Sequence, residues 1–167
     1  LLEDSKKEMF NLSFQFNRII MDQRQFIEDL SVLASQDGLT KLHNYKSFQD
    51  ELEKVVAGTE RYSDHNILAV AVLDSFKSVN DKYGHVAGDH VLQNVARYFS
   101  DNIRKFDFVA RYGGEEFVFI LKNTSIENGF RILDRLRQNL ADLPVEYQGE
   151  NIYVTMSVGV TSVTPEN

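Results

Sequence analysis

The chain has 167 residues, of which 43% are apolar and 26% are charged, a balance typical of a folded domain with its own hydrophobic core. A formal net charge of -7 argues against a general nucleic-acid binder, and the absence of cysteine excludes disulfides and thiolate metal sites. No apolar run has the length of a membrane span, and no signal peptide is visible. Because the chain opens on Leu1 and Leu2 without methionine, we expect a soluble, cytoplasmic piece of a longer sensor protein.

Residues 1–35 contain no proline or glycine and show a heptad pattern. One series of the heptad is Met9, Phe16, Gln23 and Leu30, and the second, three positions later, is Leu12, Ile19, Phe26 and Leu33. This pattern predicts a coiled-coil helix that holds two copies side by side as a homodimer, with the polar Gln23 fixing the register. The alternative is an amphipathic helix packed on its own domain.

The next segment begins the folded domain, which we expect to span residues 36–167. A turn at Asp37-Gly38 and a short connector through Asn44 precede a predicted helix over 45–56, ending at Gly58. Residues 66–73 form a continuous apolar run, which is typical of a buried strand.

Two helices are predicted after that strand. The first covers 75–83 with Asp74 as its N-cap, and residues 84–88 read as a loop. Asp89 would then cap a longer helix that runs to about Arg104. Capping alone is the simplest role for both aspartates.

Residues 108–121 contain two apolar runs around Gly113 and Gly114, a pattern that predicts a tight β-hairpin. Paired glycines supply the positive φ that such turns require, and they leave the backbone bare for a ligand. Glu115 and Glu116 follow, and adjacent strand residues face opposite sides, so one of them would point into a given site. The simplest alternative is a hairpin with solvated glutamates.

The last predicted elements are an amphipathic helix over 126–140 and a final strand pair, 145–147 with 152–160, around Gly149. The element order indicates an α+β domain with a mostly antiparallel central sheet covered by helices.

A candidate site lies where the buried strand and the hairpin would meet. If they are neighbours, Asp74 lies close to Glu115 and Glu116. Carboxylates beside helix N-termini suit a Mg²⁺–phosphate ligand, because Mg²⁺ prefers oxygen ligands and free N–H groups bind phosphates.

Three segments together resemble the GGDEF family of diguanylate cyclases over about residues 36–160. They are Asp37-Gly38-Leu39-Thr40-Lys41-Leu42-His43-Asn44, the run from Asp74 to Asp89, and Arg111-Tyr112-Gly113-Gly114-Glu115-Glu116-Phe117. The resemblance implies a fold similar to adenylyl cyclase catalytic domains and polymerase palms. It also implies a reaction that joins two GTP molecules into cyclic di-GMP and uses Mg²⁺ or Mn²⁺.

The resemblance also assigns roles by position. Asn80 and Asp89 would hold the guanine edge, whose donors and acceptors an amide and a carboxylate can match. The backbone near Ser75, Phe76 and Lys77 would contact phosphates. Glu115 and the Leu73 carbonyl would bind the metal, and Glu116 would support the metal or the attacking hydroxyl. His85 would lie close to the nucleotide. A surface histidine is the alternative for His85.

A product-inhibition site is implied by Arg104 and Asp107, which match the Arg-x-x-Asp pattern of the family, with Arg135 as a second arginine. An arginine fork suits phosphate or guanine, and an aspartate accepts from guanine N–H groups. The alternative for Arg104 is a cation at a helix C-terminus.

Three features depart from the family pattern. Val72 stands where active relatives have a metal-binding aspartate, through natural degeneracy or engineered inactivation. Asp74 lies about 6.8 Å further along the strand, so it cannot replace that aspartate without a backbone shift. Tyr45 stands where an arginine is usual. The last helix of the family, which holds the triphosphate, is absent from this chain.

The sequence therefore predicts a diguanylate cyclase output domain acting as a two-fold dimer below an upstream sensor, with GTP as substrate and no nucleic-acid or membrane partner in this segment. The alternative is a catalytically impaired receptor for cyclic di-GMP or GTP, and a third possibility is a dimerisation module without a ligand.

Overall fold

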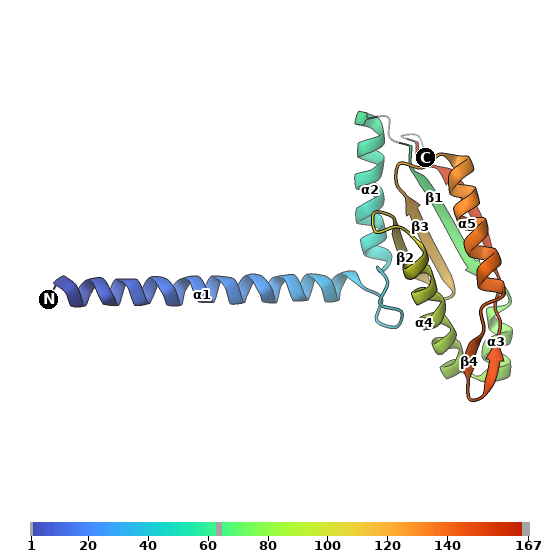
Figure 1. Ribbon diagram of the computed structural model, residues 1–167, viewed down its shortest axis with the longest axis horizontal. Helices are drawn as coiled ribbons and strands as arrows, with labels where there is room; N and C mark the ends of the chain where they lie inside the picture. Colours follow the sequence, from blue (N-terminus) through green and yellow to red (C-terminus); the bar gives the residue numbers. More distant parts are fainter. Residues whose placement is uncertain (1, 63–64, 165–167) are drawn as a thin grey trace. The chain divides into compact units, whose positions relative to one another are not determined.

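Figure 1 shows the computed structural model, which describes residues 2–62 and 65–164. The chain divides into two compact units, Leu1–Ser35 and Gln36–Asn167. Among the described residues, no helix has the combination of length and apolar character that crossing a membrane requires.

The first unit is a single helix, α1 (Leu2–Ser35), as the absence of proline and glycine predicted. Its described seam positions are largely exposed, with Phe16 at 64%, Ile19 at 55% and Phe26 at 63%. The side chains of Met9, Leu12 and Leu33 lie outside the described part of the structure. The coiled coil itself stays a prediction.

The second unit is built on a four-stranded sheet with the order β2-β3-β1-β6, in which each neighbouring pair is antiparallel. The strands are β1 (Ile67–Leu73), β2 (Phe108–Gly113), β3 (Glu116–Leu121) and β6 (Met156–Ser162). The predicted α+β class with a mostly antiparallel sheet is confirmed.

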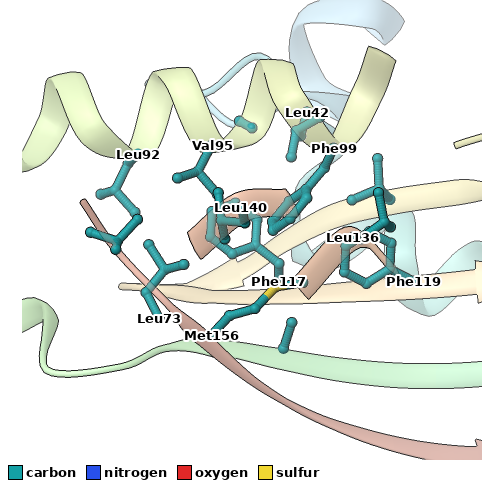
Figure 2. Packing of buried hydrophobic residues seen from close by; sticks show 14 of the residues in the cluster. Leu42, Leu73, Leu92, Val95, Phe99, Phe117, Phe119, Leu136, Leu140 and Met156 are labelled. Carbon is teal, nitrogen blue, oxygen red and sulfur yellow. The ribbon is translucent and has the colours of Figure 1, made fainter. Parts of the chain in front are cut away.

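Helices cover both faces of this sheet (Figure 1). The helices are α2 (Tyr45–Tyr62), α3 (Phe76–Tyr83), α4 (His85–Asn102) and α5 (Ile126–Ala141). One face packs against α4 and α5, where Phe99 meets Phe117 and Phe119 edge-on at ring-centroid distances of 5.2 and 5.1 Å (Figure 2). The other face packs against α2 in a smaller cluster. Alternate residues of each strand therefore serve two different cores.

The prediction for the final strand pair gave residues 145–147 the wrong partner. Val145–Tyr147 (β4) pairs with Glu150–Ile152 (β5) in a separate two-stranded ribbon around Gly149. The run 152–160 is interrupted at residues 153–155, and β6 joins the main sheet beside β1. Its alternating Met156, Val158 and Val160 face the α4–α5 core, and the gain in burial explains the choice of partner.

Two helix boundaries also differ from the prediction. Helix α2 continues through Gly58 to Tyr62, and Thr59 Oγ1 donates to the Val55 carbonyl at 2.9 Å within the continuing turn. Residues 85–88 are the first turn of α4 rather than a loop, so Asp89 is inside the helix and is not its N-cap. Gly84 and Gly88 made this segment read as a loop. Gly84 ends α3, and Gly88 allows α4 to pack closely on α3.

Candidate active site

The hairpin tip lies beside the C-terminal end of β1, as the sequence predicted. The Leu73 N–H donates to the Glu115 carbonyl at 3.2 Å, and Val72 stands opposite Glu116 in the β1–β3 register. This contact brings the glutamates and the start of α3 to one end of the sheet.

The turn of the hairpin differs in detail from the prediction. Gly113 is still in β2 and pairs with Glu116, so the two turn residues are Gly114 and Glu115. Of the two glycines, Gly114 has the positive φ of 45° that the turn requires. Glu115 therefore lies in the turn itself, whereas Glu116 begins β3.

Val72 lies next to Glu116 on the face of the sheet that packs against α2. Glu116 alternates with Val118 and Ile120, which belong to the α2 cluster, and Val72 is its cross-strand partner. The valine is half-buried and has no oxygen to offer a cation.

Asp74 does not point toward Glu116, and it does not cap α3. Its Oδ2 accepts from Thr155 Oγ1 at 2.6 Å and its Oδ1 accepts from Ser157 Oγ at 2.7 Å, on the β6 side of β1. These hydrogen bonds, from Thr155 first and Ser157 second, lower the pKa of Asp74. The carboxylate is therefore held, ionised, away from the hairpin, and it cannot replace the missing ligand at position 72.

Because Asp74 is engaged with β6, the N-terminus of α3 has no side-chain cap within the described residues. The cap position is Ser75, a non-glycine residue in the left-handed region with φ 52° and ψ 27°. Such strained conformations occur most often at ligand-binding sites. The first-turn N–H groups of Phe76 and Lys77 are the type of donors that bind phosphate oxygens.

Asn80 on α3 is brought against the turn of α4 that carries Asp89. A Cβ placed on Gly88 would lie 1.9 Å from Asn80 Oδ1, so the Asn80 amide occupies the space that a side chain there would need. Asp89 follows Gly88 and is exposed, and His85 is exposed in the first turn of the same helix. The close packing of α3 on α4 thus places the Asn80 amide against the helical turn that carries Asp89.

The donor set fits a divalent cation only in part. Within residues 2–62 and 65–164, no three acidic or histidine side chains come together as a metal cluster. Glu115, Glu116 and the Leu73 carbonyl are oxygen donors at the same end of the sheet. Since Mg²⁺ is commonly held by one or two carboxylates plus substrate phosphates, these groups fit a metal that arrives with a nucleotide.

The connector positions the hairpin through a contact that sequence reasoning missed. Arg111 donates from Nε and Nη2 to the Gly114 carbonyl at 2.9 and 2.7 Å, and from Nη1 to Asp37 Oδ1 at 3.1 Å. Burial raises the pKa of Asp37, but hydrogen bonds from Thr40 and the Arg111 guanidinium outweigh it and lower the pKa overall. The sequence signal for this contact is that Asp37 and Arg111 each open one of the segments that resemble the family.

Two of the three predicted inhibitory residues, Arg104 and Asp107, lie at the turn between α4 and β2. Asp107 already accepts from two backbone N–H groups, those of Arg104 at 3.4 Å and Lys122 at 3.1 Å, so it also holds the turn. Arg104 lines two hollows, of about 210 and 260 Å³. The α5 arginine that lines the second hollow with it is Arg131, and Arg135 is exposed elsewhere on the helix.

A family model described as "Diguanylate cyclase, GGDEF domain" matches residues 34–167. Among curated proteins, diguanylate cyclase DgcP of Pseudomonas aeruginosa is 40% identical over 149 residues, 87% of this chain and 22% of DgcP. Diguanylate cyclase A of Treponema denticola is 37% identical over 163 residues, 95% of this chain and 43% of that protein. The chain thus spans less than half the length of these relatives.

Solved structures show the same similarity. The coiled coil and GGDEF domain of DgcB from Caulobacter crescentus, in complex with c-di-GMP, superposes with a TM-score of 0.83 at 30% identity, covering 90% of this chain and 81% of that one. Diguanylate cyclase SiaD of Pseudomonas aeruginosa, in complex with its activator SiaC, gives a TM-score of 0.75 at 32% identity, covering 96% of this chain and 64% of SiaD.

Proposed function

Because the chain belongs to the GGDEF domain family of diguanylate cyclases, we propose that it binds GTP at the hairpin end of the sheet and joins two GTP molecules into cyclic di-GMP. In this reaction the 3′-hydroxyl of each nucleotide attacks the α-phosphate of the other, and each attack releases one pyrophosphate.

A single observation supports this proposal most strongly, the contact between the Gly114–Glu115 turn and the end of β1 at Leu73. It places the bare backbone of the hairpin next to the uncapped start of α3. A nucleotide whose base is held on α3 and α4 would extend its phosphates toward this junction.

The side chains divide the recognition of GTP between them. Asn80 and Asp89 would read the guanine edge, with His85 close by, while the first-turn N–H groups of Ser75, Phe76 and Lys77 would bind phosphate oxygens. Glu115, the Leu73 carbonyl and Glu116 would hold Mg²⁺ or Mn²⁺ together with the phosphates. The metal, when bound, supplies charge neutralisation at the reacting phosphate.

Two such half-sites must face each other, and two-fold symmetry provides this arrangement. The exposed seam of α1 is the surface that we expect to join the two copies. Holding both nucleotides in place makes the step effectively unimolecular. The longer length of the relatives is consistent with a sensor segment that acts through this helix.

Val72 should slow the reaction, because a valine beside Glu116 removes one metal oxygen that Asp74 cannot replace. We expect Val72→Asp to raise the rate of cyclic di-GMP formation at least about tenfold, which corresponds to about 1.4 kcal/mol of barrier. The measurement is product formation from GTP at saturating Mg²⁺, followed by chromatography.

The matched control is Val70→Asp, which adds the same charge on the same face of β1, two residues away, where the side chain is 42% exposed. Its rate should stay at that of the unaltered chain. Robust turnover by the unaltered chain, with no gain from Val72→Asp, would contradict the proposed metal role.

The same valine favours a second function, a receptor that binds cyclic di-GMP at Arg104, Asp107 and Arg135 and signals through the dimer. Arg104 is exposed and lines both hollows at its turn, so its guanidinium is accessible to a ligand. We expect Arg104→Ala to weaken cyclic di-GMP binding about tenfold or more, measured by calorimetry, since charged hydrogen bonds contribute about 1.5–3 kcal/mol. Lys46→Ala, at an exposed lysine of α2 that lines neither hollow, is the control, and an unchanged affinity for Arg104→Ala would remove the site.

A further inference from the structure

Two exposed tyrosines pack against each other next to the hairpin. Tyr45 is the first residue of α2, and Tyr112 lies in β2 just before the Gly113–Gly114 pair. Their rings meet edge-on, with centroids 4.9 Å apart and an interplanar angle of 88°. Each is 43% exposed, so the pair is packed together and still open to a ligand.

The pair is held in place from α2. Gln49 Nε2 donates to Tyr45 Oη at 3.0 Å, and Phe48 packs edge-on against the Tyr112 ring at 6.0 Å. The start of α2 is fixed by Asn44 Oδ1, which accepts from the Ser47 N–H at 3.0 Å. The hydroxyl of Tyr45 is thus oriented by a neighbouring side chain rather than free to rotate.

Tyr112 stays protonated near neutral pH. Its pKa is raised by repulsion from Tyr45 when both phenols ionise, then by a hydrogen bond with Tyr45, and to a smaller extent by burial and the charge of Glu116. Tyr112 directly precedes Gly113, whose backbone pairs with Glu116. Tyr112 therefore keeps its phenol proton, and its O–H remains available for hydrogen bonding.

Tyr112 and Glu116 share the face of the sheet against which α2, the helix that carries Tyr45, packs. Tyr112 alternates with Phe108 and Ala110, and Glu116 with Val118, all on the face that packs against α2. A register shift between Arg111 and Gly113 sets Tyr112 beside the Gly113–Glu116 pair. Glu116 thus has the end of β2 that carries Tyr112 on one side and Val72 of β1 on the other.

We propose that Tyr45 and Tyr112 are positioning residues that hold the ribose 3′-hydroxyl of the partner's nucleotide against Glu116. A sugar hydroxyl both donates and accepts, so it can donate to the Glu116 carboxylate while it accepts from a tyrosine O–H. The exposed ring supplies a flat apolar surface for the ribose carbons. This inference rests on the proposed function, since the attacking hydroxyl must come within reach of the α-phosphate at the same hairpin.

The test compares the binding of GTP and 3′-deoxy-GTP, with Mg²⁺, to the full chain by calorimetry. The unaltered chain should bind GTP more tightly than 3′-deoxy-GTP, by about three- to tenfold for one net hydrogen bond. Tyr45→Phe and Tyr112→Phe keep the rings and remove the hydroxyls, so each should reduce that ratio toward one while binding of 3′-deoxy-GTP stays unchanged. Tyr153→Phe, an exposed tyrosine between β5 and β6, is the matched control.

A kinetic readout separates positioning from simple affinity. Tyr45→Phe should lower kcat for cyclic di-GMP about tenfold and leave KM for GTP within about twofold, because the base and phosphate contacts are elsewhere. If both Phe variants discriminate the two nucleotides as the unaltered chain does, the inference is overturned. The proposed function then still stands if Asn80→Ala abolishes GTP binding, and it fails separately if the unaltered chain binds no GTP.

Discussion

At the scale of single residues, Gly88 sets the geometry of the side of the site where we propose that the base binds. The Asn80 amide occupies the volume next to the Gly88 Cα, where a Cβ would come within 1.9 Å of Oδ1. Backbone and amide cannot both keep their places if a methyl group is added. The glycine thus leaves room for the Asn80 amide where α3 packs on α4, and it does not serve a turn.

We expect Gly88→Ala to weaken GTP binding about tenfold or more, because the displaced Asn80 loses its hydrogen bonds to the base, which contribute about 1–3 kcal/mol when a polar partner is left unpaired. Overpacking should also lower the free energy of unfolding by about 1–3 kcal/mol. Calorimetry with GTP and urea unfolding measure the two effects. Gly38→Ala, where the added Cβ meets no atom within 4 Å, is the control. Normal GTP affinity in Gly88→Ala would contradict the placement of the base.

At the scale of elements, the connector and the hairpin form one mechanical unit. Arg111 binds the Gly114 carbonyl and Asp37 at once, so the turn that carries Glu115 is tied to residues that directly follow α1 in the chain. The side chains are 15% and 23% exposed, which limits screening by solvent. The Arg111 N–H also donates to the His43 carbonyl at 2.9 Å, so backbone as well as side chain ties the connector to β2.

The contribution of this ion pair to the free energy of unfolding should depend on pH. The pKa of Asp37 is lowered in the folded state, so its contribution to stability is complete above the unfolded pKa of about 3.9 and is lost as the pH falls through the folded value. We expect Asp37→Asn to lower the free energy of unfolding at pH 7 by about 1.5–3 kcal/mol. The difference from the unaltered chain should shrink below about pH 4.

Urea unfolding between pH 3 and pH 7 measures this difference, with Asp50→Asn, an exposed carboxylate on α2, as the control. A difference that is the same at pH 3 and pH 7 would show that the Asp37 charge is not responsible.

Elements also show where sequence reasoning succeeds and fails. The β1 run and the hairpin were predictable because continuous or paired apolar runs around a glycine turn have few other solutions. The pairing of β6 with β1 was not, since residues 152–160 read as one strand and the choice of neighbour depends on the distant α4–α5 core. The prediction for the start of α4 failed because Gly88, which packs against Asn80, looks the same in sequence as a glycine needed for a loop.

At the site, the motif residues were identifiable and their contacts were not. Asp74 was expected to cap α3, and the hydroxyls of Thr155, just before β6, and Ser157, in β6, bind it instead. Neither hydroxyl is close to Asp74 in sequence, so their proximity requires the sheet order. The Tyr45–Tyr112 pair depends in the same way on how α2 lies on β2.

At the scale of the whole molecule, the proposed reaction requires two copies, and the exposed seam of α1 is the surface expected to join them. Phe26 is 63% exposed and lies on the seam, whereas Met21 is 66% exposed and lies off it. We expect deletion of residues 1–33, or Phe26→Ser, to convert a dimer into a monomer in light scattering. Met21→Ser should leave the dimer intact. An unchanged oligomeric state after the deletion would show that the heptads are not the dimer interface.

The central claim is that guanine nucleotide binds across α3, α4 and the hairpin tip. A crystal structure of the chain with GTP and Mg²⁺ tests it most directly. We predict that the base lies between Asn80 and Asp89, with the phosphates at the start of α3 and next to Glu115. A nucleotide found on another surface, with Asn80 and Asp89 free of it, would contradict the account.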